Sequence, residues 1–249
     1  MMKKIFQKML FSVGYWIGKG IKSSFSKEIG YLNDQNNFHP IKIWNLDERK
    51  KSYEYFKKYF DKSMLFESRE KIQNFSVNKA CENFSNENYL FLEFGVFNGD
   101  SISRISNILK KYNKQIYGFD SFEGLSEDWK GFSEPKGTFT RNGKVPELSN
   151  DNIKIIKGDI KKTLKNFLNK NSQKIAFVHI DTDTYETAKY ILENIKPRLV
   201  KNSIILFDEL YNFFGWREGE FKALLEVFSD NEFNYIAFTN SQQVTIQIL

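Results

Sequence analysis

The chain of 249 residues has few of the side chains that build disulfide frameworks and metal cages. Its one cysteine, Cys81, excludes a disulfide within the chain and cannot form a zinc site alone. Its two histidines, His39 and His179, are too few for a histidine-based metal cage. A single thiol fits a reducing compartment, so we expect a cytoplasmic protein.

The N-terminal segment lacks an apolar run long enough to span a bilayer. Its apolar stretch, Met9–Ile17, is too short to cross a membrane, and no small-residue cleavage site follows it. Basic residues flank this stretch within Met1–Lys22. We interpret the segment as an amphipathic basic helix that either packs in a dimer or over the active site, or rests on a membrane surface.

The charge is positive but dispersed. Lysine and arginine number 37 against 31 aspartate and glutamate residues, and no arginine-rich block concentrates the net charge of +6. We therefore expect a solubilising surface and no nucleic-acid partner. Apolar residues make up 41% of the chain, which is enough to bury the core of one sizeable α/β domain.

The hydrophobic pattern divides the chain into two regions. Residues 1–85 have helical patterns without strand alternation, and we expect a helical cap or dimerisation segment. Residues 86–249 alternate strand and helix signals, which predicts a doubly wound parallel sheet in a catalytic domain. The expected strands are Tyr89–Phe94, Gln115–Phe119, Ile153–Lys157, Ile175–Ile180, Ser203–Phe207, Phe233–Phe238 and Gln243–Leu249.

Two connections stand out among these strands. Only Thr239–Gln242 separates the last two strands, which predicts a hairpin and an antiparallel last strand. The expected fold is therefore a Rossmann-like α/β sheet of seven strands, parallel except for the last. The polar connection 126–152 is rich in Gly, Pro, Lys and Glu, and its length on the ligand side of the sheet predicts a substrate lid.

A glycine-containing turn closes the first expected strand and opens a helix. Gly95 and Gly99 allow a tight turn close to a ligand, and the following helix presents free N–H groups. The spacing is E-x-G-x-x-x-G, which differs from the dinucleotide pattern. Because Glu93 would pair with an ammonium group and repel a phosphate, the turn favours S-adenosylmethionine over NAD. The alternative is a tight strand–helix turn without a ligand.

Acidic residues follow each of the next strands. Asp120 is placed to accept the ribose hydroxyls of an adenosine, or to cap the next segment. Asp159 is placed to accept from the adenine amino group, or to cap a helix. Asp181 and Asp183 follow the fourth strand, and Asp208-Glu209 follows the fifth.

The later acids form a candidate metal site. Up to four carboxylates meet at one sheet edge, and such oxygen ligands suit Mg²⁺, which would bind an acceptor hydroxyl and lower its pKa. The alternative is a set of helix caps and lysine-paired surface acids. His179 lies two residues before Asp181, on the same face of the strand, and is either a core histidine or a base.

Several of these runs together resemble the macrocin O-methyltransferase-like group of S-adenosylmethionine enzymes, over roughly residues 64–249. They are Tyr117–Leu125, Glu127–Trp129, His179–Tyr185, Phe207–Glu209 and Gly215-Trp216. The resemblance implies methyl transfer to an acceptor hydroxyl, often on a sugar, with Mg²⁺. The cofactor residues that it implies are Glu93, Gly95, Gly99, Ser101, Asp120 and Asp159, and we expect Asn98, Ser121 and Asp181 to join them.

The metal ligands that the resemblance implies are Asp181, Asp208 and Glu209. Members with an established metal site carry an Asp-Asp pair where this chain has Asp208-Glu209, which puts metal dependence in question. The catalytic residues that we expect are Asp183, which takes the acceptor proton, or His179 in its place, together with Asp181.

We therefore expect an O-methyltransferase acting on a sugar hydroxyl, on a nucleotide-linked, surface-polysaccharide or natural-product sugar, and we expect a homodimer. Two alternatives remain. One is the same fold acting on an amine or phosphate-type acceptor without metal. The other is a non-catalytic nucleotide-binding scaffold.

Overall fold

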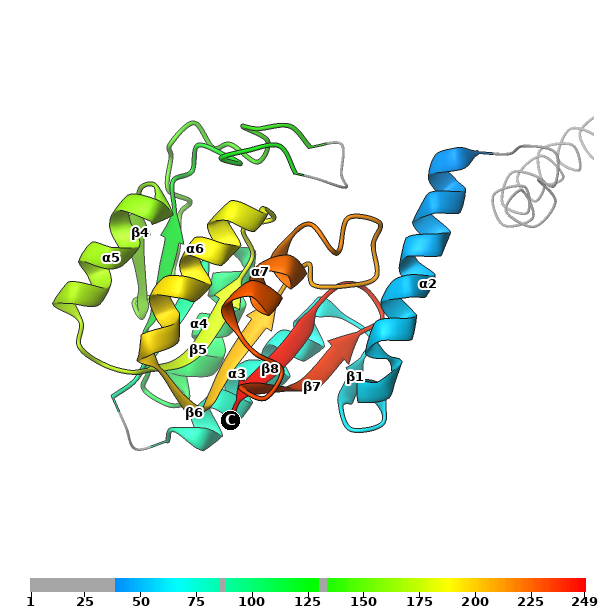
Figure 1. The fold of residues 1–249 in the computed structure, drawn as a ribbon. Coiled ribbons are helices and arrows are strands. Elements are labelled where there is room, and N and C mark those ends of the chain that lie inside the picture. Colours follow the sequence, from blue (N-terminus) through cyan, green and yellow to red (C-terminus); the bar gives the residue numbers. More distant parts are fainter. Residues whose placement is uncertain (1–38, 86–87, 130–133) are drawn as a thin grey trace, which may run out of the picture. The chain divides into compact units, whose positions relative to one another are not determined.

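The computed structural model describes residues 39–85, 88–129 and 134–249 (Figure 1). The expected amphipathic helix within Met1–Lys22, with its dimer or membrane contact, lies outside the described residues. Within the described residues, no helix is both long enough and apolar enough to cross a membrane. The first described helix, α2 (Pro40–Phe60), is mostly polar, and its Phe56 is fully buried in the core.

One sheet of eight strands forms the centre of the fold, in the order β1-β7-β8-β6-β5-β2-β3-β4. Strands β6, β5, β2, β3 and β4 are parallel to their neighbours in this order. Strand β8 is antiparallel to both β6 and β7, as the hairpin predicted. The strands are β1 (Met64–Phe66), β2 (Leu90–Phe94), β3 (Ile116–Asp120), β4 (Ile153–Lys157), β5 (Ile175–Ile180), β6 (Leu199–Phe207), β7 (Phe233–Thr239) and β8 (Val244–Ile248).

The seven strands predicted from the sequence are present as β2 to β8, so the Rossmann-like α/β fold is confirmed. Strand β6 begins at Leu199, earlier than the predicted Ser203. Strand β1 was not predicted, and its parallel pairing with β7 makes the sheet one strand wider than expected. With three residues, β1 is too short to show an alternating pattern.

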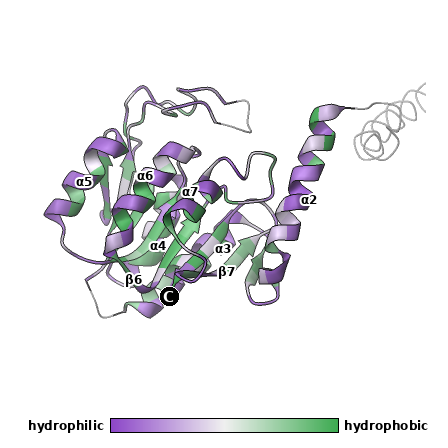
Figure 2. Ribbon diagram, in the orientation of Figure 1, coloured by the Kyte–Doolittle hydropathy of each residue, from purple (hydrophilic) through white to green (hydrophobic). Residues whose placement is uncertain are grey.

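Helices cover both faces of the sheet. On one face, α3 (Arg69–Asn83) and α4 (Asp100–Lys110) bury Ile72, Val77, Ile102 and Ile105 against the strands. The other face is covered by α5 (Ile160–Lys170), α6 (Tyr185–Ile195), α7 (Glu220–Val227) and Phe56 of α2. A short 3₁₀ turn, η1 (Lys196–Arg198), joins α6 to β6. Figure 2 shows hydrophobic strands between helices whose outer faces are hydrophilic.

The order of the strands reverses between β2 and β5. From β2 the chain continues outward to β3 and β4, and then returns to β5 and β6 on the other side of β2. In open parallel sheets, ligands bind at the carboxyl ends of the strands beside such a reversal. The connection from Ser121 to Asn152 runs above this edge, and its described residues form no helix or strand, as the sequence predicted.

Candidate active site

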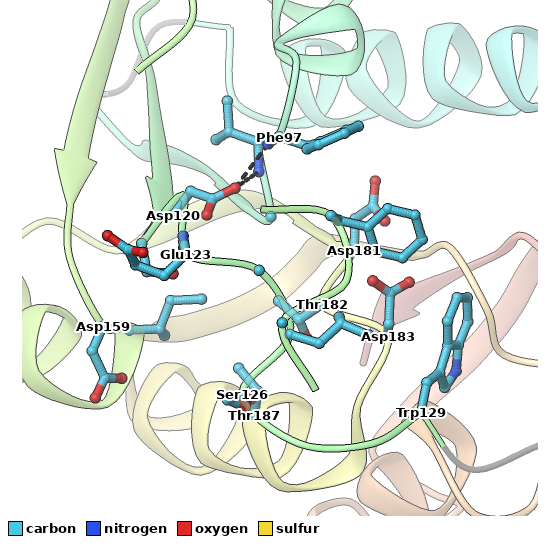
Figure 3. A pocket seen from close by; sticks show the side chains of 18 of the residues that line it. Phe97, Asp120, Glu123, Ser126, Trp129, Asp159, Asp181, Thr182, Asp183 and Thr187 are labelled. Atoms are coloured by element: carbon cyan, nitrogen blue, oxygen red, sulfur yellow. Dashed lines mark hydrogen bonds between the residues drawn. The ribbon is translucent and has the colours of Figure 1, made fainter. Parts of the chain in front are cut away.

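A cavity of about 770 Å³ lies at the carboxyl edge of the sheet. Residues that directly follow five neighbouring strands line it, together with the connection after β3 (Figure 3). Backbone hydrogen bonds hold the strand ends level: Gly95 N–H to Phe119 O at 3.0 Å, and Asp181 N–H to Phe94 O at 2.9 Å. The chain therefore brings residues far apart in sequence into one concave site.

The turn after β2 passes close to the end of β5. Gly95 has a φ of 89°, and a Cβ atom there would lie 1.7 Å from the carbonyl oxygen of Asp181, so this position accepts only glycine. Gly99, with a φ of 86°, is the N-cap of α4. Phe97 has a φ of 46°, which is uncommon for a residue with a side chain. The turn is thus shaped for close approach of a ligand to its backbone.

The predicted cofactor residues divide into two groups. Gly95, Asp120, Ser121, Asp159 and Asp181 line the cavity. Asp159 also caps α5 by accepting from the N–H of Lys161 at 2.9 Å, so the capping alternative is observed at a residue that still faces the cavity.

Four other predicted cofactor residues, Glu93, Asn98, Gly99 and Ser101, lie beside the cavity without lining it. Glu93 is fully buried, where it accepts from the hydroxyl of Ser101 at 2.7 Å and lies 3.2 Å from Nδ1 of His179. Its carboxylate therefore joins the start of α4 to the end of β5 through these two partners, and its predicted contact with a ligand ammonium stays a prediction. Asn98 accepts a hydrogen bond from Arg141 of the connection after β3.

The acids after β5 and β6 gather into two groups. Ligand atoms of Asp181, Asp183 and Glu209 converge within 4.8 Å of one another, and all three residues line the cavity. The second group is His179, Asp181 and Asp208, in which Asp208 is buried and does not line the cavity. The predicted metal set of Asp181, Asp208 and Glu209 is thus divided between the two groups, which share Asp181. Glu220, which the sequence did not single out, is also buried beside them and accepts from the N–H of Glu209 at 3.0 Å.

Burial and mutual repulsion shift the pKa values of this cluster. Burial, followed by the charge of Asp208, raises the pKa of Asp183 to about 7 and raises the pKa of Asp181. The same two causes raise the pKa of Glu209. Burial would raise the pKa of Asp208 as well, but His179 and Arg69 lower it to about 2. Asp183 is thus a carboxylate that faces the cavity and titrates near neutral pH.

His179 lies between two carboxylates. Its Nδ1 is 3.2 Å from Glu93, and its Nε2 is 3.7 Å from Asp208. Burial opposes protonation, but the neighbouring Asp208 and Glu93 outweigh it and raise the pKa of His179 to about 10. The side chain is fully buried and does not line the cavity described above, as the core-histidine interpretation of the sequence expects.

Arg69, the first residue of α3, was not predicted as a site residue. Its guanidinium pairs with Asp181 through Nη2 and with Asp208 through Nε, the latter at 2.6 Å. Burial alone would lower the pKa of Arg69, but the surrounding acids, led by Asp181 and Asp208, raise it. Arg69 also lines the cavity. A serine N-cap followed by an arginine is an ordinary helix start, so only the fold reveals that this arginine reaches the acids.

The predicted lid supplies aromatic walls. Trp129 and Phe139 line the cavity with Phe97, and the rings of Phe97 and Phe139 meet edge to face at 5.7 Å. Both phenylalanines are substantially exposed, at 39% and 41%, and Phe139 also has a positive φ, of 64°. Exposed rings held in a strained backbone at a cavity mouth are typical of a binding surface.

The comparisons with known proteins agree with this geometry. Residues 92–210 match the sequence model of a family described as a methyltransferase domain. A structure of the calicheamicin methyltransferase CalS11 has a TM-score of 0.60 at 20% identity, covering 91% of this chain and 92% of that one. A second structure of CalS11, described as a TDP-rhamnose 3'-O-methyltransferase, has a TM-score of 0.52 at 22% identity, over 72% and 80% of the two chains.

Two further structures share the fold. The O-methyltransferase NovP has a TM-score of 0.54 at 19% identity, over 72% of this chain and 79% of that one. An O-methyltransferase from Bacillus cereus in complex with S-adenosylhomocysteine has a TM-score of 0.50 at 11% identity, over 91% and 97%. No curated protein sequence matches the chain. Residues 92–210 thus form a methyltransferase domain, the enzyme class predicted from the sequence, and the solved structures show that the chain shares the fold of such enzymes.

Proposed function

We propose that the protein transfers a methyl group from S-adenosylmethionine to a hydroxyl of a sugar, one that is nucleotide-linked or belongs to a surface polysaccharide or natural product. The observation that carries this proposal is the shared cavity, which joins the predicted cofactor residues Gly95 and Asp120 to the carboxylate of Asp183. CalS11 and NovP, which have the same fold, are O-methyltransferases by description, and CalS11 acts on TDP-rhamnose.

The two ends of the cavity suit the two reactants. Figure 3 places Asp159 and Asp120 toward one end, and Asp183 with Trp129 toward the other. We assign the first end to the adenosine of S-adenosylmethionine, with Asp120 at the ribose. Its methionine part would lie along the turn at Gly95, where no side chain blocks the backbone of Asp181. The methyl group would then face the acids after β5 and β6.

The acceptor end has chemistry suited to a sugar. The rings of Phe97, Phe139 and Trp129, of which the first two are exposed, offer the negatively polarised faces on which the C–H groups of a sugar ring pack. The carboxylates of Asp181 and Asp183 accept hydrogen bonds from hydroxyls. Lys136 of the lid also lines the cavity and supplies positive charge for a phosphate-bearing sugar.

The chain must align the acceptor and remove its proton. The sulfonium of S-adenosylmethionine already activates the methyl group. The acceptor oxygen forms the new C–O bond as the S–C bond breaks, and its proton passes to a carboxylate oxygen of Asp183. A base that titrates near neutral pH suits this role, and the pKa of Asp183 is raised to about 7. We assign the role to Asp183 rather than His179, because His179 is fully buried and does not face the cavity.

The test is turnover on a panel of TDP- and UDP-linked sugars, followed by release of S-adenosylhomocysteine, with wild type and Asp183→Asn. We expect methylation of at least one sugar by wild type and a loss of about 100-fold or more in the variant, the usual worth of a positioned base. Calorimetry should find unchanged binding of S-adenosylhomocysteine to the variant. The same assay is repeated with amines in place of the sugars. If wild type methylates an amine and the variant is as active as wild type, the proposal is contradicted and the amine acceptor is favoured.

A further inference from the structure

Arg69 lies among the acids at the carboxyl edge of the sheet. Its guanidinium occupies the space between Asp181 at the end of β5 and Asp208 at the end of β6, and contacts both carboxylates. These are two of the three ligands expected to hold Mg²⁺. Arginine keeps its charge at every relevant pH, and its planar fork matches paired carboxylates.

The predicted metal set does not fit this arrangement. An ion shared by Asp181, Asp208 and Glu209 would have to displace Arg69 from both aspartates, or lie within a few ångströms of its positive charge. Two cations at such a distance repel strongly in a partly buried site. Asp208 also lies 3.7 Å from Nε2 of His179, so its carboxylate is held between the guanidinium of Arg69 and this ring.

We propose that Arg69 is the resident cation of this site and takes the place of a divalent metal. This inference rests on the proposed function. Arg69 is a positioning residue: it fixes the carboxylates of Asp181 and Asp208 and offsets their negative charge beside Asp183. Methyl transfer then needs no metal, because the proton of the acceptor leaves to Asp183 and the sulfonium is already activated.

The acids that face the cavity offer a competing place for a divalent ion. The acids Asp181, Asp183 and Glu209 converge, and Oε2 of Glu209 is buried without a hydrogen-bond partner among the described residues. A divalent ion beside Arg69 would bind there. The experiment must therefore detect an ion at either place, and it cannot depend on an unidentified acceptor.

The test is titration of the full chain with MnCl₂, read by electron paramagnetic resonance, in wild type, Arg69→Ala, Arg69→Lys and Lys71→Ala. Lys71 lies on the same helix, is exposed and pairs with Glu67, so its loss changes the net charge equally without touching the acids. We expect no Mn²⁺ binding at millimolar concentration in wild type, Arg69→Lys or Lys71→Ala. In Arg69→Ala we expect the affinity to rise by about tenfold or more.

The result that would overturn the proposal is one Mn²⁺ bound per wild-type chain and lost in Asp183→Asn. If Arg69→Ala fails to fold, as seen by thermal unfolding, Arg69→Met keeps the length of the side chain without its charge and should gain the ion. Calorimetry with S-adenosylhomocysteine runs in parallel on each protein. Failure of wild type to bind S-adenosylhomocysteine would count against the proposed function. Binding of both S-adenosylhomocysteine and Mn²⁺ by wild type would count against the role of Arg69 only.

Discussion

The carboxylate of Asp120 holds the turn that carries Phe97. Its Oδ2 accepts the backbone N–H groups of Val96 and Phe97, each at 2.8 Å, and its Oδ1 accepts from Phe122 at 2.7 Å (Figure 3). One side chain at the end of β3 thus fixes the turns after both β2 and β3. An ionised carboxylate has about four acceptor sites, so Asp120 has room for a ribose hydroxyl while it keeps these bonds.

Asp120→Ala should abolish binding of S-adenosylhomocysteine and lower stability. Hydrogen bonds to a charged group are worth roughly 1.5–3 kcal/mol each, and three are lost at once, so we expect at least about 2 kcal/mol of destabilisation. Calorimetry measures the binding, and urea unfolding measures the stability. Asp151→Ala is the matched control, because Asp151 is exposed and pairs only with the surface residue Lys110 among the interactions described. Equal affinity in wild type and Asp120→Ala would remove Asp120 from the cofactor site.

Gly95→Ala should damage the site far more than Gly137→Ala. Both glycines have nearly the same positive φ, 89° and 87°, so alanine brings similar backbone strain of about 1–2 kcal/mol at each. At Gly95 the new methyl group also meets the carbonyl of Asp181, whereas nothing lies within 4 Å at Gly137. We expect Gly95→Ala to lose cofactor binding and Gly137→Ala to keep it. Equal losses would show that strain alone, and not the close approach to Asp181, limits the site.

The fold could be predicted from the sequence wherever its signal is local. Strands β2 and β5 are near-continuous apolar runs, because parallel central strands are buried on both faces, and α4 repeats its apolar residues at helical spacing. Strand β1 has only three residues and depends on β7, more than 160 residues away in sequence, for its pairing, so no local pattern reports it. The helix pattern of α3 was visible, but its packing on the sheet was not.

The residues of the candidate site could likewise be predicted from the sequence only in part. Acids that follow parallel strands must meet at one edge, which placed Asp120, Asp159, Asp181 and Asp183 at the cavity. Two features depend on the burial of side chains and could not be predicted: Asp208 is buried beside His179, and Glu93 is buried under the turn. Arg69 lies 112 residues from Asp181 in sequence, and only the packing of α3 brings them together.

Asp183 should make stability depend on pH near neutrality. Its pKa is raised from 3.8 to about 7 by burial and by Asp208, so the native state binds the proton more tightly than the unfolded chain. Its unfavourable charge therefore destabilises the fold above about pH 7, and this cost is relieved as the pH falls toward about 4. Asp183→Asn should melt higher than wild type at pH 8, and the gap should narrow markedly by pH 5, as measured by calorimetric scans. In Asp151→Asn, a control whose pKa Lys110 lowers, the gap should stay constant over that range. A gap for Asp183→Asn that widens on acidification would contradict the assignment.

Phe56 should be the residue of α2 on which the stability of the fold depends most. Its ring is fully buried and lies 5.3–5.8 Å from the rings of Tyr211, Trp216, Phe221, Tyr235 and Phe238. Phe56→Ala leaves a cavity that these large rings cannot fill, which costs about 3–5 kcal/mol. Tyr53→Ala removes an aromatic ring from the same helix, but Tyr53 is 52% exposed, so the change should stay within about 0.5 kcal/mol. Urea unfolding measures the free energy of unfolding of both variants. Similar losses in the two would mean that α2 contributes little to the core through Phe56.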